Sequence, residues 1–188
     1  MGSLTQVQKS LLIGTILGDG YLRIIPQRKN AFLEVNHSVK QKDYVDWKYF
    51  ILQSIVKSKP KLRKSNNKRI AYRFYTRCLS EITDLFQIFY KDGKKIVPKN
   101  LEINLFSLAV WYMDDGSKSG KSIYLNSQQF SDLDQIKLQK ILLHQFGINS
   151  NLNKDKIYLR IRIKNSDVKK FCNIIRKFIP QSMQYKLV

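Results

Sequence analysis

One nine-residue pattern occurs twice in this chain and limits its fold more than any other sequence feature. The two copies are residues 12–20 and 108–116, and their acids, Asp19 and Asp115, lie 96 residues apart. Each copy is an apolar segment with a small residue near its start and an Asp-Gly end. Such a segment predicts a buried helix, and its final glycine predicts a C-cap with positive φ. Small residues allow two of these helices to pack backbone against backbone, which would bring Asp19 and Asp115 together.

The secondary-structure signals around the two motifs repeat in the same order. Thr5 to Gln8 fits a capping box that opens the first helix. In the first half, apolar periodicity predicts three helices, one that ends at residue 18, one over 41–56 and one over 80–90 ended by Asp92-Gly93. Between them it predicts two hairpins, one over 21–39 that turns at 26–30 and one over 61–77 that turns at 65–67. In the second half it predicts three helices, over 105–114, over 131–146 ended by Gly147, and over 166–178. Between them it predicts a strand region over 122–130 and a hairpin over 152–164 that turns at 153–155. This duplication predicts an α+β fold with pseudo-two-fold symmetry.

Basic residues occur along the whole chain and give it a net charge of +20, from 34 Lys and Arg against 14 Asp and Glu. Segments 69–77 and 157–164 both alternate apolar with basic or tyrosine side chains, which predicts strands with one buried and one basic face. Two such faces favour a surface that binds nucleic acid, although a Lys-rich composition alone also makes a surface basic. The candidate DNA contacts are Arg23, Arg28, Asn36, Ser38, Arg63, Arg69, Arg73, Tyr75, Arg77, Tyr124, Asn126, Gln128, Tyr158, Arg160, Arg162 and Lys164.

Other sequence features argue against several protein classes. No apolar run reaches the length of a membrane span, and the polar start lacks the apolar region of a secretory signal. Cys78 and Cys172 form no CxxC pair, which is typical of reduced intracellular thiols. His37 and His144 lack metal-ligand spacing, so we expect both to be structural. The sequence therefore predicts a soluble intracellular domain.

The two acidic helix ends point to cation chemistry. A carboxylate at a helix C-terminus is electrostatically unfavourable, because that end of the helix dipole is already negative. Two carboxylates brought together would also repel each other. A divalent cation with a bound phosphate would relieve both effects, since Mg²⁺ is commonly held by one or two carboxylates plus phosphate oxygens and water. The alternative for a single copy is that Asp-Gly only forms a turn, and the matched second copy makes this interpretation the weaker one.

At these residues the chain resembles the LAGLIDADG homing endonucleases, because both motifs are present and the duplicated pattern covers nearly the whole chain. The resemblance extends to the single-chain branch that includes the mitochondrial omega-intron endonuclease. That branch has a Lys-Lys-x-x-Pro segment, matched by residues 94–98, and an Ile-Pro-Gln…Tyr-Lys-Leu ending, matched by residues 179–181 and 185–187. The chain departs from the family pattern at Gly18, where the family name has alanine, and in a Tyr-Lys segment one residue further from Pro180.

The resemblance implies two αββαββα repeats, residues 1–98 and 99–188, with saddle-shaped antiparallel sheets over DNA and motif helices packed at the interface between the halves. It implies a monomeric, intron-encoded DNA endonuclease that makes a double-strand break with 3′ overhangs at a long target site. Its implied cofactor is Mg²⁺, at roughly two or three ions with Mn²⁺ as a substitute. The implied place of action is intracellular: a mitochondrion, a chloroplast or bacterial cytoplasm. The implied metal ligands are Asp19, Asp115, Gly18 and Asp114, and the implied catalytic residues are Asp19, Asp115, Lys95 and Lys186.

Two alternatives use the same fold without the same chemistry. One is an intron-RNA-binding maturase, a splicing factor that would bind its intron in preference to duplex DNA. The other is a transcription regulator, which would bind DNA equally well in a chelator and never nick it. Both acids and both lysines are present, and this favours the endonuclease.

Overall fold

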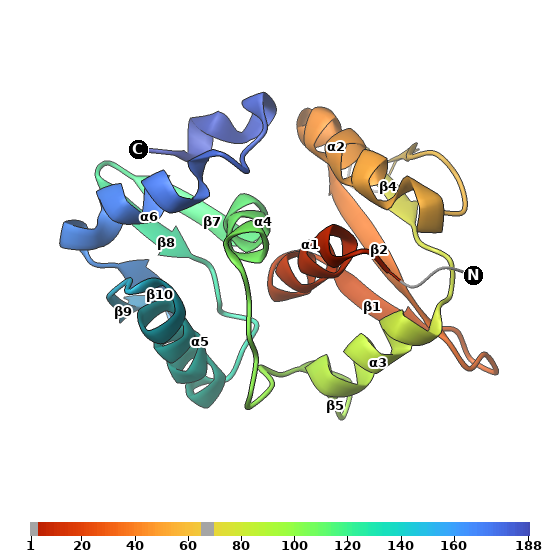
Figure 1. Ribbon diagram of the computed structural model, residues 1–188, viewed down its shortest axis with the longest axis horizontal. Helices are drawn as coiled ribbons and strands as arrows, with labels where there is room; N and C mark the ends of the chain where they lie inside the picture. Colours follow the sequence, from red (N-terminus) through yellow and green to blue (C-terminus); the bar gives the residue numbers. More distant parts are fainter. Residues whose placement is uncertain (1–3, 65–69) are drawn as a thin grey trace.

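The computed structural model describes residues 4–64 and 70–188, which form two halves that lie side by side (Figure 1). The first half is built from a regular series of elements. These are α1 (Gln6–Leu17), β1 (Tyr21–Ile24), β2 (Ala31–Ser38), α2 (Lys42–Leu52), β3 (Lys61–Lys64), β4 (Ile70–Tyr75) and α3 (Ser80–Phe89), with short 3₁₀ turns η1 (Val39–Gln41) and η2 (Gln53–Ile55). A small hairpin of β5 (Tyr90–Lys91) and β6 (Lys94–Lys95) follows.

The second half repeats this series. Its elements are α4 (Leu105–Asp115), β7 (Gly116–Ser119), β8 (Ser122–Leu125), α5 (Asp132–Phe146), β9 (Ser150–Asp155), β10 (Tyr158–Ile163) and α6 (Val168–Arg176), with 3₁₀ turns η3 (Asn165–Asp167) and η4 (Gln181–Lys186). Each half contains one antiparallel four-stranded sheet, in the orders β1-β2-β4-β3 and β7-β8-β10-β9. These orders are equivalent, so the predicted α+β class with two αββαββα repeats is confirmed.

The two motif helices, α1 and α4, pack against each other at the centre of the molecule (Figure 1). Their backbones approach so closely that a Cβ atom on Gly14 would lie 2.5 Å from the carbonyl oxygen of Ser107. The Ser107 hydroxyl donates to the Ser10 carbonyl oxygen at 2.9 Å, which is a further link between the helices. The small residues of the motif therefore allow the close packing that the sequence predicts.

The prediction for the glycines after the two acids is wrong. Gly116 has φ −74° and ψ 145°, and Gly20 does not have positive φ either. What these positions require is space: a Cβ on Gly20 would lie 2.7 Å from the Thr15 carbonyl oxygen, and one on Gly116 would lie 2.2 Å from that of Tyr112. Because the chain turns back tightly on each helix, a side chain has no room there.

The strand boundaries differ from the sequence prediction in three places. Strand β7 was not predicted, Asp92-Gly93 forms the turn of the β5–β6 hairpin rather than the end of a helix, and residues 153–155 continue β9. The β9–β10 turn contains Lys156, with positive φ, and Ile157, which is 81% exposed and not in the buried face. The predicted turn at 65–67 lies outside the described residues. Helix boundaries agree within a few residues, including the Thr5–Gln8 capping box and the Gly147 end of α5.

The core is formed by the inner faces of both sheets together with the helices that cover them. Its largest fully buried side chains include Trp111, Tyr44, Tyr112 and Phe74. Within residues 4–64 and 70–188, no helix combines the length and the apolarity that a membrane crossing requires.

We expect Gly14→Ala to lower the free energy of unfolding by about 1–3 kcal/mol, because overpacking forces well-packed neighbours apart. The added Cβ would lie 2.5 Å from the Ser107 carbonyl oxygen and 2.7 Å from the Val110 Cβ. Urea denaturation measures the loss. Lys9→Ala, on the exposed side of the same helix, is the control, and an equal effect of both substitutions would contradict tight packing at Gly14.

Candidate active site

The two motif acids lie at the same end of the α1–α4 pair. Asp19 directly follows the C-cap of α1 and its side chain is 49% exposed, whereas Asp115 ends α4 and is half-buried. Burial, together with the nearby carboxylates of Asp19 and Asp114, raises the pKa of Asp115 to about 8, against the opposing effect of the Lys95 ammonium. The two carboxyl groups therefore repel each other, and the Asp115 carboxyl is poorly solvated, as expected for groups that share a cation.

Lys95 is held beside the acids by the β5–β6 hairpin. Its ammonium donates to the Gly18 carbonyl oxygen at 2.8 Å and to Gln129 Oε1 at 2.9 Å. The hairpin is fixed to the first half because the Leu22 N–H donates to Tyr90 Oη at 3.0 Å. Burial lowers the pKa of Lys95 to about 8, against the opposing effect of three aspartates.

Lys186 has the equivalent place in the second half but reaches it from η4. Its ammonium donates to the Asp114 carbonyl oxygen at 3.2 Å and to that of Met113. The Tyr112 hydroxyl donates to the Lys186 carbonyl oxygen and so fixes its backbone. Lys186 is buried, and that burial lowers its pKa. Each lysine thus contacts the carbonyl group that immediately precedes one motif acid.

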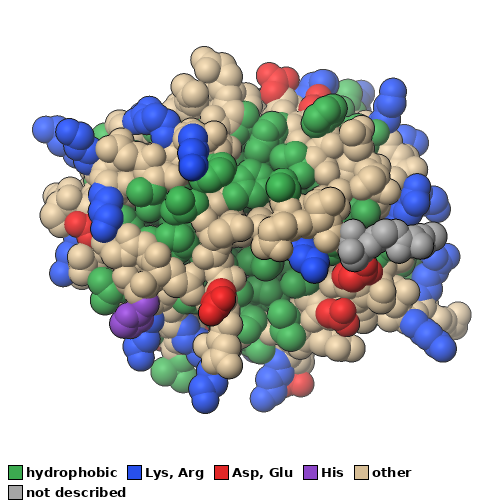
Figure 2. Space-filling model, in the orientation of Figure 1, with side chains coloured by type: hydrophobic (Ala, Val, Ile, Leu, Met, Phe, Trp, Pro, Cys, Tyr) green, Lys and Arg blue, Asp and Glu red, His purple; other side chains and the backbone are tan. Residues whose placement is uncertain are grey.

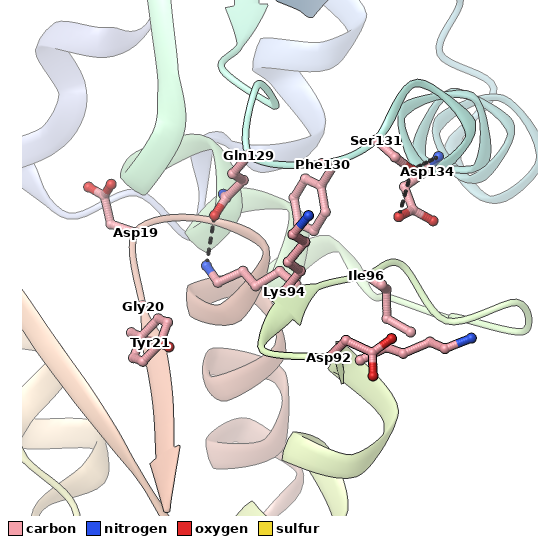
Figure 3. Close-up of a pocket in the computed structure, with 12 residues that line it drawn as sticks. Asp19, Gly20, Tyr21, Asp92, Lys94, Ile96, Gln129, Phe130, Ser131 and Asp134 are labelled. Atoms are coloured by element: carbon pink, nitrogen blue, oxygen red, sulfur yellow. Dashed lines mark hydrogen bonds between the residues drawn. The ribbon is translucent and has the colours of Figure 1, made fainter.

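Gln129, in the β8–α5 loop, is a site residue that the sequence analysis missed (Figure 3). Its amide Nε2 donates to Asp115 Oδ2 at 3.0 Å and to the Gly18 carbonyl oxygen at 3.2 Å. The neighbouring Gln128, a predicted DNA contact, instead donates to Asp155 at 3.3 Å. No motif or periodicity marks Gln129, and only the folded loop brings it to the acids.

The side chain of Asp114 points away from the motif acids into a buried cluster. Its carboxylate accepts hydrogen bonds from Lys48 Nζ at 2.7 and 2.8 Å and from the Tyr44 hydroxyl at 2.7 Å. His37 Nε2 lies 3.8 Å from Asp114 Oδ1, and His37 Nδ1 lies 3.5 Å from Asp19 Oδ2. Burial lowers the pKa of His37, and the Lys48 charge lowers it further. Only the backbone carbonyl of Asp114 is therefore left for the site.

The donor atoms at this place fit a hard divalent cation. They are the carboxylates of Asp19 and Asp115 together with the carbonyl oxygens of Gly18 and Asp114, and oxygen ligands of these kinds suit Mg²⁺. Among the described residues, no group of three or more His, Cys, Asp or Glu side chains could hold a metal by itself. A cation here would share its coordination with phosphate oxygens and water.

A cavity of about 950 Å³ opens beside Asp19 (Figure 3). Asp19, Lys95 and Gln129 line it, as do Lys91 and Lys94 of the β5–β6 hairpin. Its charged lining consists of three lysines, Lys91, Lys94 and Lys95, and three aspartates, Asp19, Asp92 and Asp134.

The outer faces of the two sheets carry many of the predicted DNA contacts. Strand register places Asn36 beside Arg73 in the first half, and Tyr124 beside Arg162 in the second. The guanidinium group of Arg160 lies 4.1 Å from the Tyr124 ring centroid, and Arg162 donates to Ser122 Oγ at 3.0 Å. Alternate residues on the same strands, such as Phe74 and Ile161, are buried, which agrees with the predicted two-faced strands.

Of the remaining predicted contacts, Arg23 and Arg63 lie within β1 and β3, and several others lie at strand ends or in loops. Arg28 is in the β1–β2 turn, Arg77 follows β4, Lys164 follows β10, and Arg69 lies outside the described residues. Figure 2 shows Lys and Arg side chains mainly along the edge of one face, with fewer acidic side chains, and hydrophobic and other side chains over most of its centre.

Known proteins resemble this chain over nearly its full length. The sequence profile of the LAGLIDADG DNA endonuclease family matches residues 9–171. The chain is 32% identical to probable intron-encoded endonuclease 1 of Wickerhamomyces canadensis, over 99% of this chain and 86% of that protein. It is 27% identical to cytochrome b mRNA maturase bI2 of Saccharomyces cerevisiae, but spans only 48% of that protein's length. Among solved structures, the chain matches that of the homing endonuclease I-WcaI bound to its DNA recognition sequence, with a TM-score of 0.93. The two sequences are 30% identical, and the match covers 100% of this chain and 88% of that one.

Proposed function

Because this chain belongs to the LAGLIDADG DNA endonuclease family, we propose that it is a homing endonuclease that makes a metal-dependent double-strand break with 3′ overhangs at a long DNA target site. The observation that carries the proposal is the convergence of two carboxylates and two lysine ammoniums at the end of the α1–α4 pair. The repeats meet at the boundary between residues 98 and 99, and one chain supplies both motif helices, so the protein acts as a monomer.

In this proposal Asp19 and Asp115, with the carbonyl groups of Gly18 and Asp114, hold Mg²⁺. The bound cation would polarise the phosphodiester and lower the pKa of a coordinated water. Lys95 and Lys186 place positive charge where a phosphate gains negative charge in the transition state. Their fixed hydrogen bonds to the motif carbonyls mean that little reorganisation is needed when the phosphate arrives.

The sheet faces are the proposed DNA-binding surface. Their arginine, asparagine and tyrosine side chains match the chemistry of base edges and phosphates. The net charge of +20 supports this role, as does the similarity to a homing endonuclease in complex with its recognition sequence. The intron-encoded relative supports a gene carried in an intron, and the cytochrome b maturase relative supports action in an organelle.

The test is cleavage of a randomised duplex-DNA library in Mg²⁺, with EDTA as the control. We expect one long motif to be cut only in Mg²⁺, and sequencing of the ends to give the overhang. Enrichment of bound DNA that is never cut, in several divalent metals, would contradict the endonuclease function and favour a regulator.

A maturase function is the second candidate, because one relative with this fold is an mRNA maturase. It predicts that the host intron RNA binds more tightly than duplex DNA. Competition between labelled intron RNA and the DNA target distinguishes the two functions.

We expect Arg162→Ala to relax discrimination at one base pair of the target by about 1–3 kcal/mol, if its guanidinium group reads a base edge. Arg162 lies on the outer face of β10 beside Tyr124. Competition binding against a panel of single-base target variants, in EDTA, measures the effect. Arg176→Ala, an exposed arginine on α6, is the control. An equal loss on every sequence would identify Arg162 as a phosphate contact.

A further inference from the structure

Each of the two four-stranded sheets carries one acidic side chain among the strand residues that the structure describes. They are Glu34 on β2 and Asp155 at the end of β9, and the other charged side chains on these strands belong to lysine and arginine. A carboxylate on a surface that binds DNA repels the phosphate groups and so lowers the affinity. The presence of an acid on each sheet therefore calls for a role that offsets this repulsion.

Glu34 lies between two arginines. Its Oε2 atom is 3.6 Å from Arg23 Nε, and its Oε1 atom is 3.6 Å from Arg73 Nη1. The sheet order explains this arrangement, because β2 lies between β1, which carries Arg23, and β4, which carries Arg73. Strand register pairs Arg23 with Phe32 and Arg73 with Asn36, so each arginine reaches Glu34 diagonally across the sheet. The Glu34 side chain is only 11% exposed, so water competes little for these contacts.

Each of the two arginines also lies over a tyrosine ring. The guanidinium carbon of Arg23 is 5.1 Å from the Tyr21 ring centroid, and that of Arg73 is 5.3 Å from the Tyr75 ring centroid. These tyrosines are the direct cross-strand neighbours of Glu34. A cation within about 6 Å of an aromatic centroid is attracted to the ring. Each guanidinium group is therefore restrained by the shared carboxylate and by a tyrosine.

The second sheet repeats part of this arrangement. Asp155 Oδ2 lies 3.7 Å from Arg160 Nη1, and the Arg160 guanidinium carbon lies 4.1 Å from the Tyr124 ring centroid. The Asp155 side chain is 40% exposed, against 11% for Glu34, so Glu34 is the better enclosed of the two acids. An acid, an arginine and a tyrosine thus occur together on both sheets, which favours a common role in DNA binding.

The restraint matters because arginine recognises guanine with two parallel N–H donors, which have to lie near the plane of the base. A free arginine side chain has many rotamers and can turn toward a phosphate of any sequence. A guanidinium group that is already held loses less conformational freedom when it meets the base, and it contacts other DNA groups less readily. The carboxylate therefore increases selectivity, while its charge decreases the affinity for every sequence.

We propose that Glu34 is a positioning residue for base recognition, which holds Arg23 and Arg73 in the orientation in which they read base pairs of the DNA target. The inference rests on the proposed function for its DNA partner, but it concerns binding alone and requires neither a metal ion nor cleavage. Its consequence is that removal of the Glu34 charge makes DNA binding stronger and less selective.

The test is a binding selection from a randomised duplex-DNA library in EDTA, made with the whole chain and with its Glu34→Gln variant. We expect Glu34→Gln to lose about fivefold or more of the base preference at the positions that Arg23→Ala and Arg73→Ala also affect, which is part of what a bidentate contact contributes. Fluorescence anisotropy in EDTA at constant salt measures binding to a duplex of unrelated sequence. We expect Glu34→Gln to bind this duplex about twofold or more tightly than the wild-type protein, because one repulsive charge is gone.

Further variants separate positioning from charge and from folding. Glu102→Gln is the matched control, since it makes the same chemical change at an exposed residue outside the sheets and should leave both readouts unchanged. Glu34→Asp restores the charge, so it should return binding of the unrelated duplex to the wild-type level and recover part of the base preference. Arg73→Ala with Glu34→Gln should lose little more preference at the Arg73 position than Arg73→Ala alone, because Glu34 acts through that arginine. A misfolded fraction lowers the amount of bound DNA without changing which bases the folded molecules prefer.

Unchanged base preference in Glu34→Gln would overturn the inference, as would an equal loss of affinity on every sequence. A loss confined to a base pair that neither arginine variant affects would also overturn it, because Glu34 would then contact a base directly, such as the amino group of cytosine. The two proposals fail separately. A wild-type protein that selects a sequence in EDTA but cuts no DNA in Mg²⁺ contradicts the endonuclease function alone, and the effect of Glu34→Gln is still read from the same selection. A wild-type protein that selects no sequence overturns both.

Discussion

Asn in place of either Asp19 or Asp115 lowers DNA cleavage at least about 10³-fold, because the site loses one of the two carboxylate charges that hold its cation. Asparagine keeps the size of the side chain, so the α1–α4 contact and the DNA-binding faces are unchanged. The measurement is single-turnover cleavage of the target in Mg²⁺, together with DNA binding by fluorescence anisotropy in EDTA. We expect binding to stay within a few fold of the wild-type value.

The same substitutions also have an expected effect on the stability of the folded protein. Burial and the Asp19 carboxylate raise the pKa of Asp115, so neutralising one of the two acids removes a repulsion from the folded state. The midpoint of thermal unfolding is therefore not lowered in either variant, which separates a catalytic loss from misfolding. Asp84→Asn, on the exposed side of α3, is the control that changes neither property. Cleavage that survives Asp19→Asn or Asp115→Asn, with intact binding, would reject the assigned mechanism.

Lys48→Met is expected to cause the largest loss of stability in the molecule, about 3–5 kcal/mol, because it leaves a buried carboxylate without its cation. Lys48 and Asp114 are both fully buried and their charged groups lie 2.7 Å apart. For a chain of this size the loss corresponds to a fall of roughly 6–20 °C in the unfolding midpoint, measured by circular dichroism.

Two further variants separate the buried charge from loss of the lysine stem. Lys42→Met breaks the Lys42–Asp46 pair in the same helix, at 2.6 Å but exposed, and should change the midpoint little. Asp114→Asn in the Lys48→Met background removes the unpaired charge and should recover most of the loss. Equal effects of Lys42→Met and Lys48→Met would contradict the importance of burial.

Most of the fold could be predicted from the sequence because each half is built from strongly patterned segments. The apolar motif helices, the capping box at Thr5 and the left-handed Gly147 end of α5 are local signals, and the structure has all three. Strand β7 escaped prediction because its sequence, Gly-Ser-Lys-Ser, has no apolar alternation. It is a strand because β8 pairs with it.

The site was harder to predict where it depends on contacts between distant segments. Asp19 and Asp115 carry their own motif, and Lys95 and Lys186 were found through the resemblance to a family. Gln129 has no local signature, because its role comes from the path of the β8–α5 loop. The sequence analysis expected glycine at positions 20 and 116 because of a positive φ, whereas the structure requires glycine there because a Cβ atom would collide with the preceding helix turn. The sequence alone cannot separate these two reasons, because the collision depends on where the atoms of that turn lie.

The close approach of Gly18 and Asp114 determines whether one half of the molecule could replace the other. A Cβ on Gly18 would lie 2.3 Å from the Cβ of Asp114, so the helix pair accepts one side chain at this crossing and not two. Two copies of the second half would bring two Asp114 residues to that point, without the Lys48 of the first half that pairs with Asp114. Two copies of the first half would avoid the clash but bury two Lys48 ammoniums with no carboxylate between them. Neither half can therefore replace the other in a symmetric dimer, and a chimera assembled from halves of related proteins has to inherit Gly18, Lys48 and Asp114 as one unit.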